Sequence, residues 1–448
     1  SLRRKFQGKL QTEERYFDEN NQPMLVPAIG HAGFQRSYDK DRRIKSEAYL
    51  DERGKPLMTA LGYALVTREY DEKGNLAVES YFDSNRQPVL NQKGYASFHK
   101  EYNDARKVLK EEYYDTAGLL VLLSEGYASI LREFDRNNNE LKAVYLGADG
   151  QPLMQKSGYA SITREFDKRK RIISERYFDG QGQPALLAAG YTGLTRNYDD
   201  QSNVTREAYL GADGRLSANS KGYAAFEKVY AGRGLVSLES YLDAEGLPVL
   251  TSDGYASISR EFDAAGNITR TAWHGTDGRL LLQKSGYAVL LRNFDEFKRV
   301  TREAYLGEDS GAVTLPNGYA ALTRSYDAAG NLNREAYFDA EGRPVLHNQG
   351  YAEVRREFNE FKQLVSEAYL GTDGQPILLA AGYAGLTRSY DAQGNIAREA
   401  YQGLDGQPIL INRGYAAIEK TYLGKNRWSM RRISTRTTSP SCSPAATR

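Results

Sequence analysis

Aromatic residues recur in this sequence at a spacing that could build a binding surface. One position is aromatic in successive 32-residue segments: Tyr49, Tyr81, Tyr113, Tyr145, Tyr177, Tyr209, Tyr241, Trp273, Tyr305, Tyr337, Tyr369 and Tyr401. If the segments stack in register, these rings form a row. Exposed rings bind sugar faces by stacking and quaternary ammonium groups by cation–π contact. Rings that close a core between segments would serve packing alone, and both interpretations remain open.

Basic residues occupy a second recurring position, in short polar segments of alternate copies. The candidates are Arg42, Arg43, Arg106, Lys107, Lys170, Arg171, Lys298 and Arg299. Such cations could hold an anionic polymer such as teichoic acid or a sulfated glycan; nucleic acid could bind the same way but is not the partner we expect. The alternative is that these loops are merely solvated and protect a sheet edge from aggregation.

Carboxylates also recur, for example Asp71 and Glu79. Paired carboxylates could perform acid–base chemistry or bind calcium. However, an Asp at the start of a turn accepts backbone N–H bonds, and a Glu can pair with a basic residue across a hairpin. We therefore expect structural roles for both, with no metal and no other cofactor.

The remaining reactive residue types form no catalytic pattern. The four histidines, His31, His99, His274 and His347, share no ligand spacing. The sequence contains no P-loop, nucleophile elbow or HExxH motif. Its single Cys excludes a disulfide framework and a Cys-rich metal site. We do not expect an enzyme.

The composition excludes further classes. The chain has 448 residues, with 60 Lys and Arg against 58 Asp and Glu, a net charge of +2 that creates no global steering field. No apolar run approaches the roughly 20 residues of a spanning helix, so we predict no membrane span. The first residues already read as mid-repeat. We therefore expect a piece of a longer protein whose native start is missing.

The elements that would position these residues are short strands. Glycine recurs every 32 residues from Gly30 to Gly414, and we number each repeat from that glycine as column 1. Columns 3, 5, 7 and 9 hold Ala, an apolar residue, a basic residue and Tyr or Phe, the period-two pattern of a strand with one buried face. A turn rich in Asp, Gly and Asn follows, then a second strand over columns 15 to 21.

We therefore predict an all-β fold, an elongated tandem-repeat β-solenoid or a spiral of stacked β-hairpins. A repeat of 32 residues cannot offset its own ordering entropy, so neighbouring repeats must supply the missing burial. A propeller is the alternative, although thirteen or more blades would not close one ring.

The turn at columns 11 to 14 alternates, which indicates a second period of 64 residues. Residues 72–75, 264–267, 328–331 and 392–395 end in Gly-Asn, whereas residues 40–43 and 168–171 are basic. One hypothesis is that each repeat makes half a circuit, which places the basic loops along one edge and the Gly-Asn loops along the other. The alternative is duplication of an ancestral pair without geometric meaning.

The repeat pattern divides the chain into three parts. Residues 1–29 are a partial and irregular first repeat, residues 30–425 are the tandem β-hairpin repeats, and residues 426–448 break the pattern. If one base were lost near residue 425, the other reading frame would restore a Gly-Tyr-Ala motif one period after Gly414. We interpret 426–448 as an out-of-frame tail that should be disordered, in which Trp428 and Cys442 have no function.

Two motifs resemble known bacterial repeats. The Tyr-Asp-x-x-Gly-Asn segments at 70–75, 326–331 and 390–395 resemble the YD repeats of RHS-type proteins. The Tyr-Phe-Asp-x-x-Gly segment at 337–342 resembles the aromatic hairpins of bacterial glucan- and choline-binding cell-wall repeats. The first resemblance implies a β shell around cargo, and the second a β-solenoid that binds sugars or choline. Both imply an extracellular or cell-surface location on a bacterium.

The prediction is therefore a non-catalytic repeat region that presents a multivalent surface to carbohydrate or an anionic cell-surface polymer, with avidity from repetition. One alternative is a structural spacer or RHS-like shell that supports another domain. Another is a protein-binding adhesin repeat.

Overall fold

The computed structural model describes residues 1–424 and 427–434, and side chains as far as Tyr422. The described residues form strands and turns without a helix. The strands are β1 (Leu2–Gln7), β2 (Leu10–Tyr16), β3 (Gly33–Tyr38), β4 (Ile44–Leu50), β5 (Leu65–Tyr70), β6 (Leu76–Phe82), β7 (Ser97–Tyr102), β8 (Val108–Tyr114), β9 (Ser129–Phe134), β10 (Glu140–Leu146), β11 (Ser161–Phe166), β12 (Ile172–Phe178), β13 (Gly193–Tyr198), β14 (Val204–Leu210), β15 (Ala225–Tyr230), β16 (Val236–Leu242), β17 (Ser257–Phe262), β18 (Ile268–His274), β19 (Val289–Phe294), β20 (Val300–Leu306), β21 (Ala321–Tyr326), β22 (Leu332–Phe338), β23 (Glu353–Phe358), β24 (Leu364–Leu370), β25 (Gly385–Tyr390), β26 (Ile396–Gln402), β27 (Ala417–Gly424) and β28 (Arg427–Ser434).

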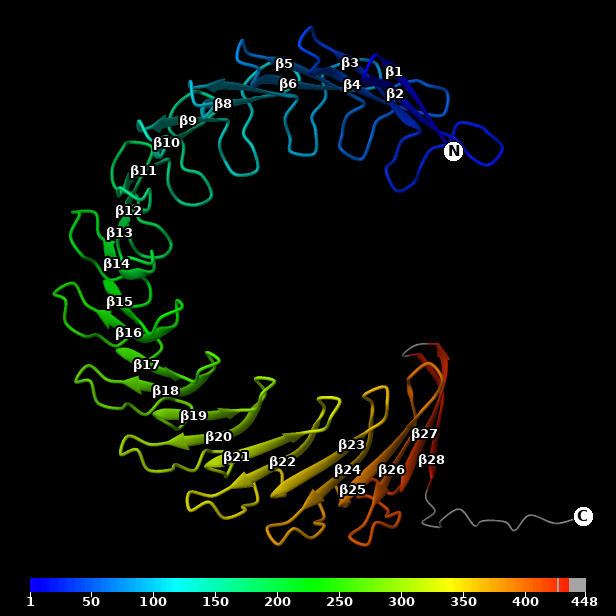
Figure 1. Ribbon diagram of the computed structural model, residues 1–448, viewed down its shortest axis with the longest axis vertical. Helices are drawn as coiled ribbons and strands as arrows, with labels where there is room; N and C mark the ends of the chain where they lie inside the picture. The colour runs from blue at the N-terminus through cyan, green and yellow to red at the C-terminus, as the bar shows by residue number, and fades with distance from the viewer. Residues whose placement is uncertain (425–426, 435–448) are drawn as a thin grey trace, which may run out of the picture. The chain divides into compact units, whose positions relative to one another are not determined.

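The chain divides into two units, which are described separately. Unit 1 comprises residues 1–226 and 243–246, and unit 2 comprises 227–242 and 247–448. Within each unit, every strand pairs antiparallel with the next strand of the sequence. Consecutive hairpins consequently lie side by side (Figure 1).

The predicted all-β tandem repeat is confirmed. Each repeat is a hairpin of two strands, such as β5 and β6, closed by a tight turn at 71–75 and followed by a long connection to the next hairpin. Because pairing continues from hairpin to hairpin within a unit, as between β6 and β7, the strands are not divided into propeller blades.

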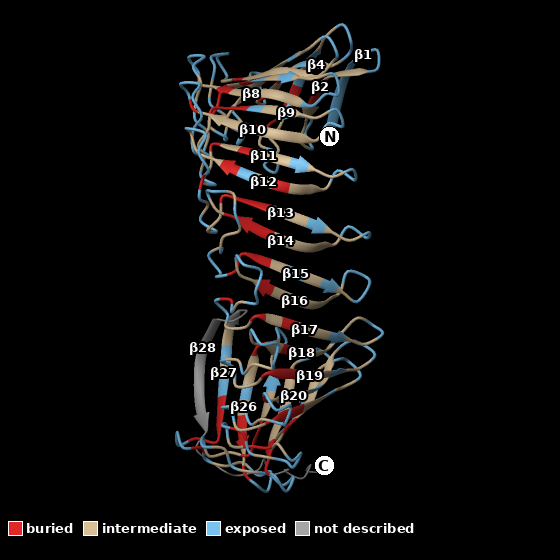
Figure 2. Ribbon diagram, turned by 90° about the vertical axis from the view of Figure 1, so that its left-hand side faces the viewer, coloured by how far each residue is buried: buried red, intermediate tan, exposed pale blue. Residues whose placement is uncertain are grey.

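The hairpins are most buried near the long connections. In β5 the buried residue is Val66, near the start of the strand, and in β6 it is Tyr81, near the end. Figure 2 shows the same gradient, with buried positions at the ends of the strands that meet the connections. Burial follows the predicted period-two pattern, since Ala64 and Val66 are both fully buried.

The tail predicted to be out of frame is described only in part. Residues 427–434 form β28, which pairs antiparallel with β27. Residues 425–426 and 435–448 lie outside the described residues. The reading-frame interpretation, and the division at residues 29 and 425, stay predictions.

Within the described residues, no helix is long and apolar enough to cross a membrane.

The glycine of column 1 has two reasons to recur. At Gly190 the backbone φ is +88°, a left-handed conformation that disfavours a side chain. A Cβ there would also lie 2.6 Å from the amide nitrogen of Ser220 in the next connection. That amide donates a hydrogen bond to the carbonyl of Ala189 at 2.8 Å, so close approach of consecutive connections depends on the missing side chain.

Substituting alanine at two such glycines should separate these causes. Gly94 has a φ of +87°, but a Cβ there would meet nothing within 4 Å. We expect Gly94→Ala to lower the free energy of unfolding by about 1 kcal/mol, from the left-handed backbone alone. Gly190→Ala should cost about 3 kcal/mol, because steric displacement adds to the strain. Chemical denaturation of both variants measures the difference, and equal losses would contradict this explanation.

Candidate functional site: aromatic and charged ladders

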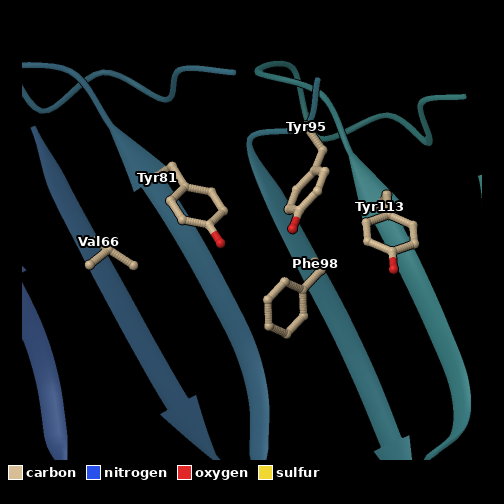
Figure 3. Packing of buried hydrophobic residues seen from close by; sticks show 5 residues of the cluster. All are labelled: Val66, Tyr81, Tyr95, Phe98 and Tyr113. Atoms are coloured by element: carbon tan, nitrogen blue, oxygen red, sulfur yellow. The ribbon is translucent and has the colours of Figure 1, made fainter. Parts of the chain in front are cut away.

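Rings from two sources alternate along the sheet and form what we call the Tyr ladder, columns 2 and 20. Column 20 lies on the second strand of each hairpin, and column 2 lies at the end of the connection that follows. Ring centroids are 5.8 Å apart between Tyr81 and Tyr95, and 4.9 Å apart between Tyr95 and Tyr113. Figure 3 shows these three rings with Val66 and Phe98 in one apolar cluster. Each column-2 ring thus joins two hairpins.

The structure places the predicted aromatic binding residues in the core. The buried members of column 20 are Tyr81, Tyr113, Tyr177, Tyr209, Tyr241, Tyr305, Tyr337, Tyr369 and Tyr401. Tyr49, Tyr145 and Trp273 are half-buried. Stacking on a sugar requires an exposed ring face, and for Tyr337, 6 % exposed, neighbouring rings occupy that space.

In most hairpins the hydroxyl group of the column-20 Tyr donates a hydrogen bond to a Glu two residues earlier. Tyr209 donates to Glu207 at 2.7 Å and Tyr369 to Glu367 at 2.8 Å. Burial, together with the adjacent carboxylate, raises the pKa of both phenols. These tyrosines therefore remain protonated donors and are not poised as bases.

The same glutamates, in column 18, pair with the basic residues of column 7, as the sequence predicted. Within hairpins the pairs are Arg36–Glu47, Arg68–Glu79, Lys100–Glu111, Arg164–Glu175, Arg196–Glu207, Lys228–Glu239, Arg292–Glu303, Arg324–Glu335, Arg356–Glu367 and Arg388–Glu399. The next hairpin adds a second cation, because Arg324 also lies 3.2 Å from Glu303. We call this row the Arg–Glu ladder.

The pKa values of two carboxyl groups, Glu111 and Glu399, show how this pairing affects ionisation. Burial alone would raise the pKa of Glu111, but hydrogen bonds from Tyr113 and Lys100 outweigh it and lower the pKa. Glu399 follows the same balance, with Tyr401 and Arg388 as partners. The carboxylates are ionised and surrounded by donors, which is a structural arrangement.

The basic loops make contacts within the protein. Arg43, Arg171 and Arg299 each form an ion pair with the Asp that starts their own turn. Each guanidinium also lies over the column-9 Tyr of the following hairpin, 4.5 Å from the ring of Tyr70 or Tyr198 and 4.4 Å from that of Tyr326. We call this contact the arginine clasp.

The clasp shows that the half-circuit hypothesis is wrong. A basic loop and the next Gly-Asn loop touch, so both lie on the same edge. In an antiparallel meander every tight turn falls on one edge of the sheet. The alternation instead reflects two kinds of turn. In one kind Arg43 donates a hydrogen bond to the Asp at the start of its turn, and in the other Asn75 does so. Only Arg43 also contacts the ring of Tyr70 in the next hairpin.

The other predicted basic residues lie on the surface. Arg42, Arg106, Lys170 and Lys298 have φ between 60° and 66°, at the position where four of the alternate loops carry Gly (Gly74, Gly266, Gly330 and Gly394). They and Lys107 are exposed. Within each unit these side chains lie along the sheet edge that carries the tight turns, and they do not converge on one binding site.

Two histidines enter the Tyr ladder: His31, at the column-2 position of the sequence, and His347, whose position in the repeat did not indicate this contact. His31 takes the place of the column-2 Tyr, with its ring 5.0 Å from that of Tyr49. His347 stacks on Tyr337 at 4.2 Å with an interplanar angle of 7°, and its Nδ1 lies 2.8 Å from the carbonyl of Tyr351. Among the described residues, no group of three or more His, Cys, Asp and Glu side chains could hold a metal ion.

Comparison with known proteins gives limited information. No family model matches the chain, and neither does any curated protein. Among solved structures it is similar to TcdB2-TccC3-Cdc42, with 11% identity, a TM-score of 0.24 and coverage of 96% of this chain and 25% of that one. The Photorhabdus luminescens Tc holotoxin pore gives 12% identity, a TM-score of 0.16 and coverage of 95% and 29%. The chain thus spans about a quarter of these proteins. At these values the similarity establishes neither a common fold nor a shared function.

The Arg–Glu ladder should contribute measurably to stability. Arg324→Gln removes the cation between Glu303 and Glu335 while keeping a polar side chain. We expect the free energy of unfolding to fall by about 2 kcal/mol, less than for a fully buried pair because the Arg324 side chain is 25% exposed. Arg343→Gln, at a side chain that is 70% exposed, is the control and should change little. An equal effect of both variants in denaturant titrations would contradict the ladder's role.

His31 predicts a pH-dependent weakness in the first hairpins. Burial lowers the pKa of its imidazole below 6.5, although Glu47 and Glu14 oppose the shift. The unfolded chain then binds the proton at higher pH than the folded chain. The stability that this group contributes is therefore fully present above the unfolded pKa and is lost as the pH falls through the unfolded and then the lower folded pKa.

His31→Tyr, which restores the ladder residue, should remove this pH dependence. Hydrogen-exchange opening free energies of β3 and β4, corrected for intrinsic exchange rates, measure it. The explanation fails if the wild type and the variant lose protection equally on acidification.

Proposed function

We propose that this chain is a non-catalytic structural repeat, a spacer or shell wall that supports another part of its protein or assembly. The observation that supports it is that the recurring chemical groups are engaged between or within hairpins. Tyr rings pack on rings, Glu carboxylates pair with two cations, and the clasp arginines cover the next Tyr. Few of these recurring aromatic and charged side chains are therefore available to bind a ligand.

Two ligand-binding functions lack such support, and the protein-binding adhesin alternative stays a prediction. Binding of carbohydrate by the Tyr ladder needs rings that are buried here. Binding of an anionic polymer by the basic loops would have to rely on the exposed loop cations, which gather around no common site, because the arginines of the clasp are paired. The proposal places the protein at or outside a bacterial cell surface, the location implied by its resemblance to YD repeats.

Two neighbouring residues of one loop distinguish structural support from polymer binding. Arg299 forms the clasp, whereas Lys298 is exposed with a φ of 62°. If the loops are structural, Arg299→Ala should lower the thermal midpoint. Lys298→Gly should leave it unchanged or raise stability by about 1 kcal/mol, because Gly relieves the left-handed backbone.

Polymer binding predicts a different result for the same pair. Retention on immobilised heparin or teichoic acid would then fall for both variants, since each loses one cation. Salt-sensitive retention of the wild type that both substitutions weaken, with unchanged thermal midpoints, would overturn the structural proposal. Absence of retention, with a loss of stability for Arg299→Ala alone, supports it.

A further inference from the structure

The face of the sheet opposite the Tyr ladder carries its own row of ion pairs. Side chains alternate between the two faces of a strand, so column 17 lies opposite the column-18 glutamates. Basic residues of column 17 pair with carboxylates: Lys110–Glu112, Lys142–Glu133, Arg270–Glu261, Arg334–Glu353 and Arg398–Glu419, at 2.7 to 3.7 Å. A cation on this face is thus normally neutralised by a neighbour.

Arg302 departs from this rule. Its cross-strand neighbours are Asn293 on β19 and Thr323 on β21, both uncharged. At the position of Asn293, the hairpin of Arg270 carries Glu261, which pairs with that arginine. Among the residues that the structure describes, the Arg302 side chain has no hydrogen-bond or ion-pair partner. This hairpin therefore keeps the basic residue of column 17 but has Asn293 where another hairpin has its carboxylate partner.

This guanidinium borders a cavity of about 310 Å³ within unit 2. Leu291, Leu306 and Phe338 line it, together with the small side chains of Ala304 and Ala321. The two alanines are 6% and 8% exposed and form an apolar floor, and the cavity above them is open to solvent. The cavity lies across β19 to β22, which are neighbours in the sheet (Figure 1).

The one carboxylate at the cavity is already engaged. Asp339 accepts hydrogen bonds from the backbone N–H groups of Glu341 and Arg343, and its Oδ2 lies 2.9 Å from Nε of Arg343. Thr323, also in the lining, can donate or accept a hydrogen bond. Arg302 is itself exposed beside the cavity, so the charge that the protein leaves without a partner there is positive and faces solvent.

We propose that this cavity binds a small carboxylate with a flat apolar body, the carboxylate on Arg302 and the body against Leu291, Leu306 and Phe338. A guanidinium and a carboxylate form two parallel charge-assisted hydrogen bonds. Benzene fits a cavity of about 150 Å³, so twice that volume accommodates roughly 12 non-hydrogen atoms. The site goes beyond the structural role, because it occurs where one repeat departs from the pattern of the others.

The test uses three probes with the same indole body: indole-3-acetate, indole and tryptamine, titrated calorimetrically into the full chain. Indole-3-acetate should bind saturably at micromolar to millimolar concentration and at least about tenfold more tightly than indole. Tryptamine, which is a cation, should bind more weakly than indole. Failure of indole-3-acetate to saturate, or equal affinity for the three probes, overturns the proposal.

Matched variants assign the two parts of the site. Arg302→Gln should weaken indole-3-acetate about tenfold and leave indole unchanged. Arg334→Gln, the same column in the next hairpin, is the control and should affect neither probe, since Glu353 already pairs with Arg334. Ala321→Leu fills the cavity and should abolish binding of both.

A fourth variant guards against misfolding of Ala321→Leu. Asn293 is exposed, so Asn293→Glu should not disturb the fold. The introduced carboxylate supplies the partner that Glu261 gives Arg270, and it should weaken indole-3-acetate by at least about tenfold. If Asn293→Glu and Arg302→Gln both leave the affinity of indole-3-acetate unchanged, Arg302 does not recognise the carboxylate and the proposal is wrong.

Discussion

Contact between consecutive hairpins is the constraint on which the structure depends. A column-2 ring such as Tyr95 leaves the long connection and packs between Tyr81 of one hairpin and Tyr113 of the next. A single hairpin supplies only one of these two neighbours, so its apolar face remains partly open to water. Burial of one tyrosine therefore requires two hairpins, which couples the folding of each repeat to that of its neighbours.

The charged groups obey the same constraint. Glu303 receives a cation from its own hairpin through Arg292 and another from the following hairpin through Arg324. An ionised carboxylate at low exposure is tolerable only with several donors around it. The apolar and the charged parts of this face are thus both completed by the neighbouring hairpin, and the two ladders run side by side across the strands.

The sequence allowed the strands and their buried faces to be predicted, because the period-two pattern and the Asp-Gly turns are local signals. Pairing of column 7 with Glu was also predictable, since both residues recur in register. The burial of Tyr337 was not, because a ring can face solvent or a neighbour with the same spacing. The half-circuit hypothesis failed at Arg43, whose contact with Tyr70 depends on where the turns lie in space. Arg302 escaped attention because its peculiarity is an absent acid at Asn293, which a motif search does not register.

The arginine clasp has a consequence for how such an array can change length. Each clasp joins a basic loop to the aromatic ring of a following hairpin whose own turn ends in Asn, as Arg171 reaches Tyr198 beside Asn203. Recombination that deletes one hairpin would bring two loops of the same kind together and break the alternation. Loss or gain of two hairpins preserves it. Related arrays should therefore differ in length by multiples of 64 residues, and the heritable module is the pair of hairpins.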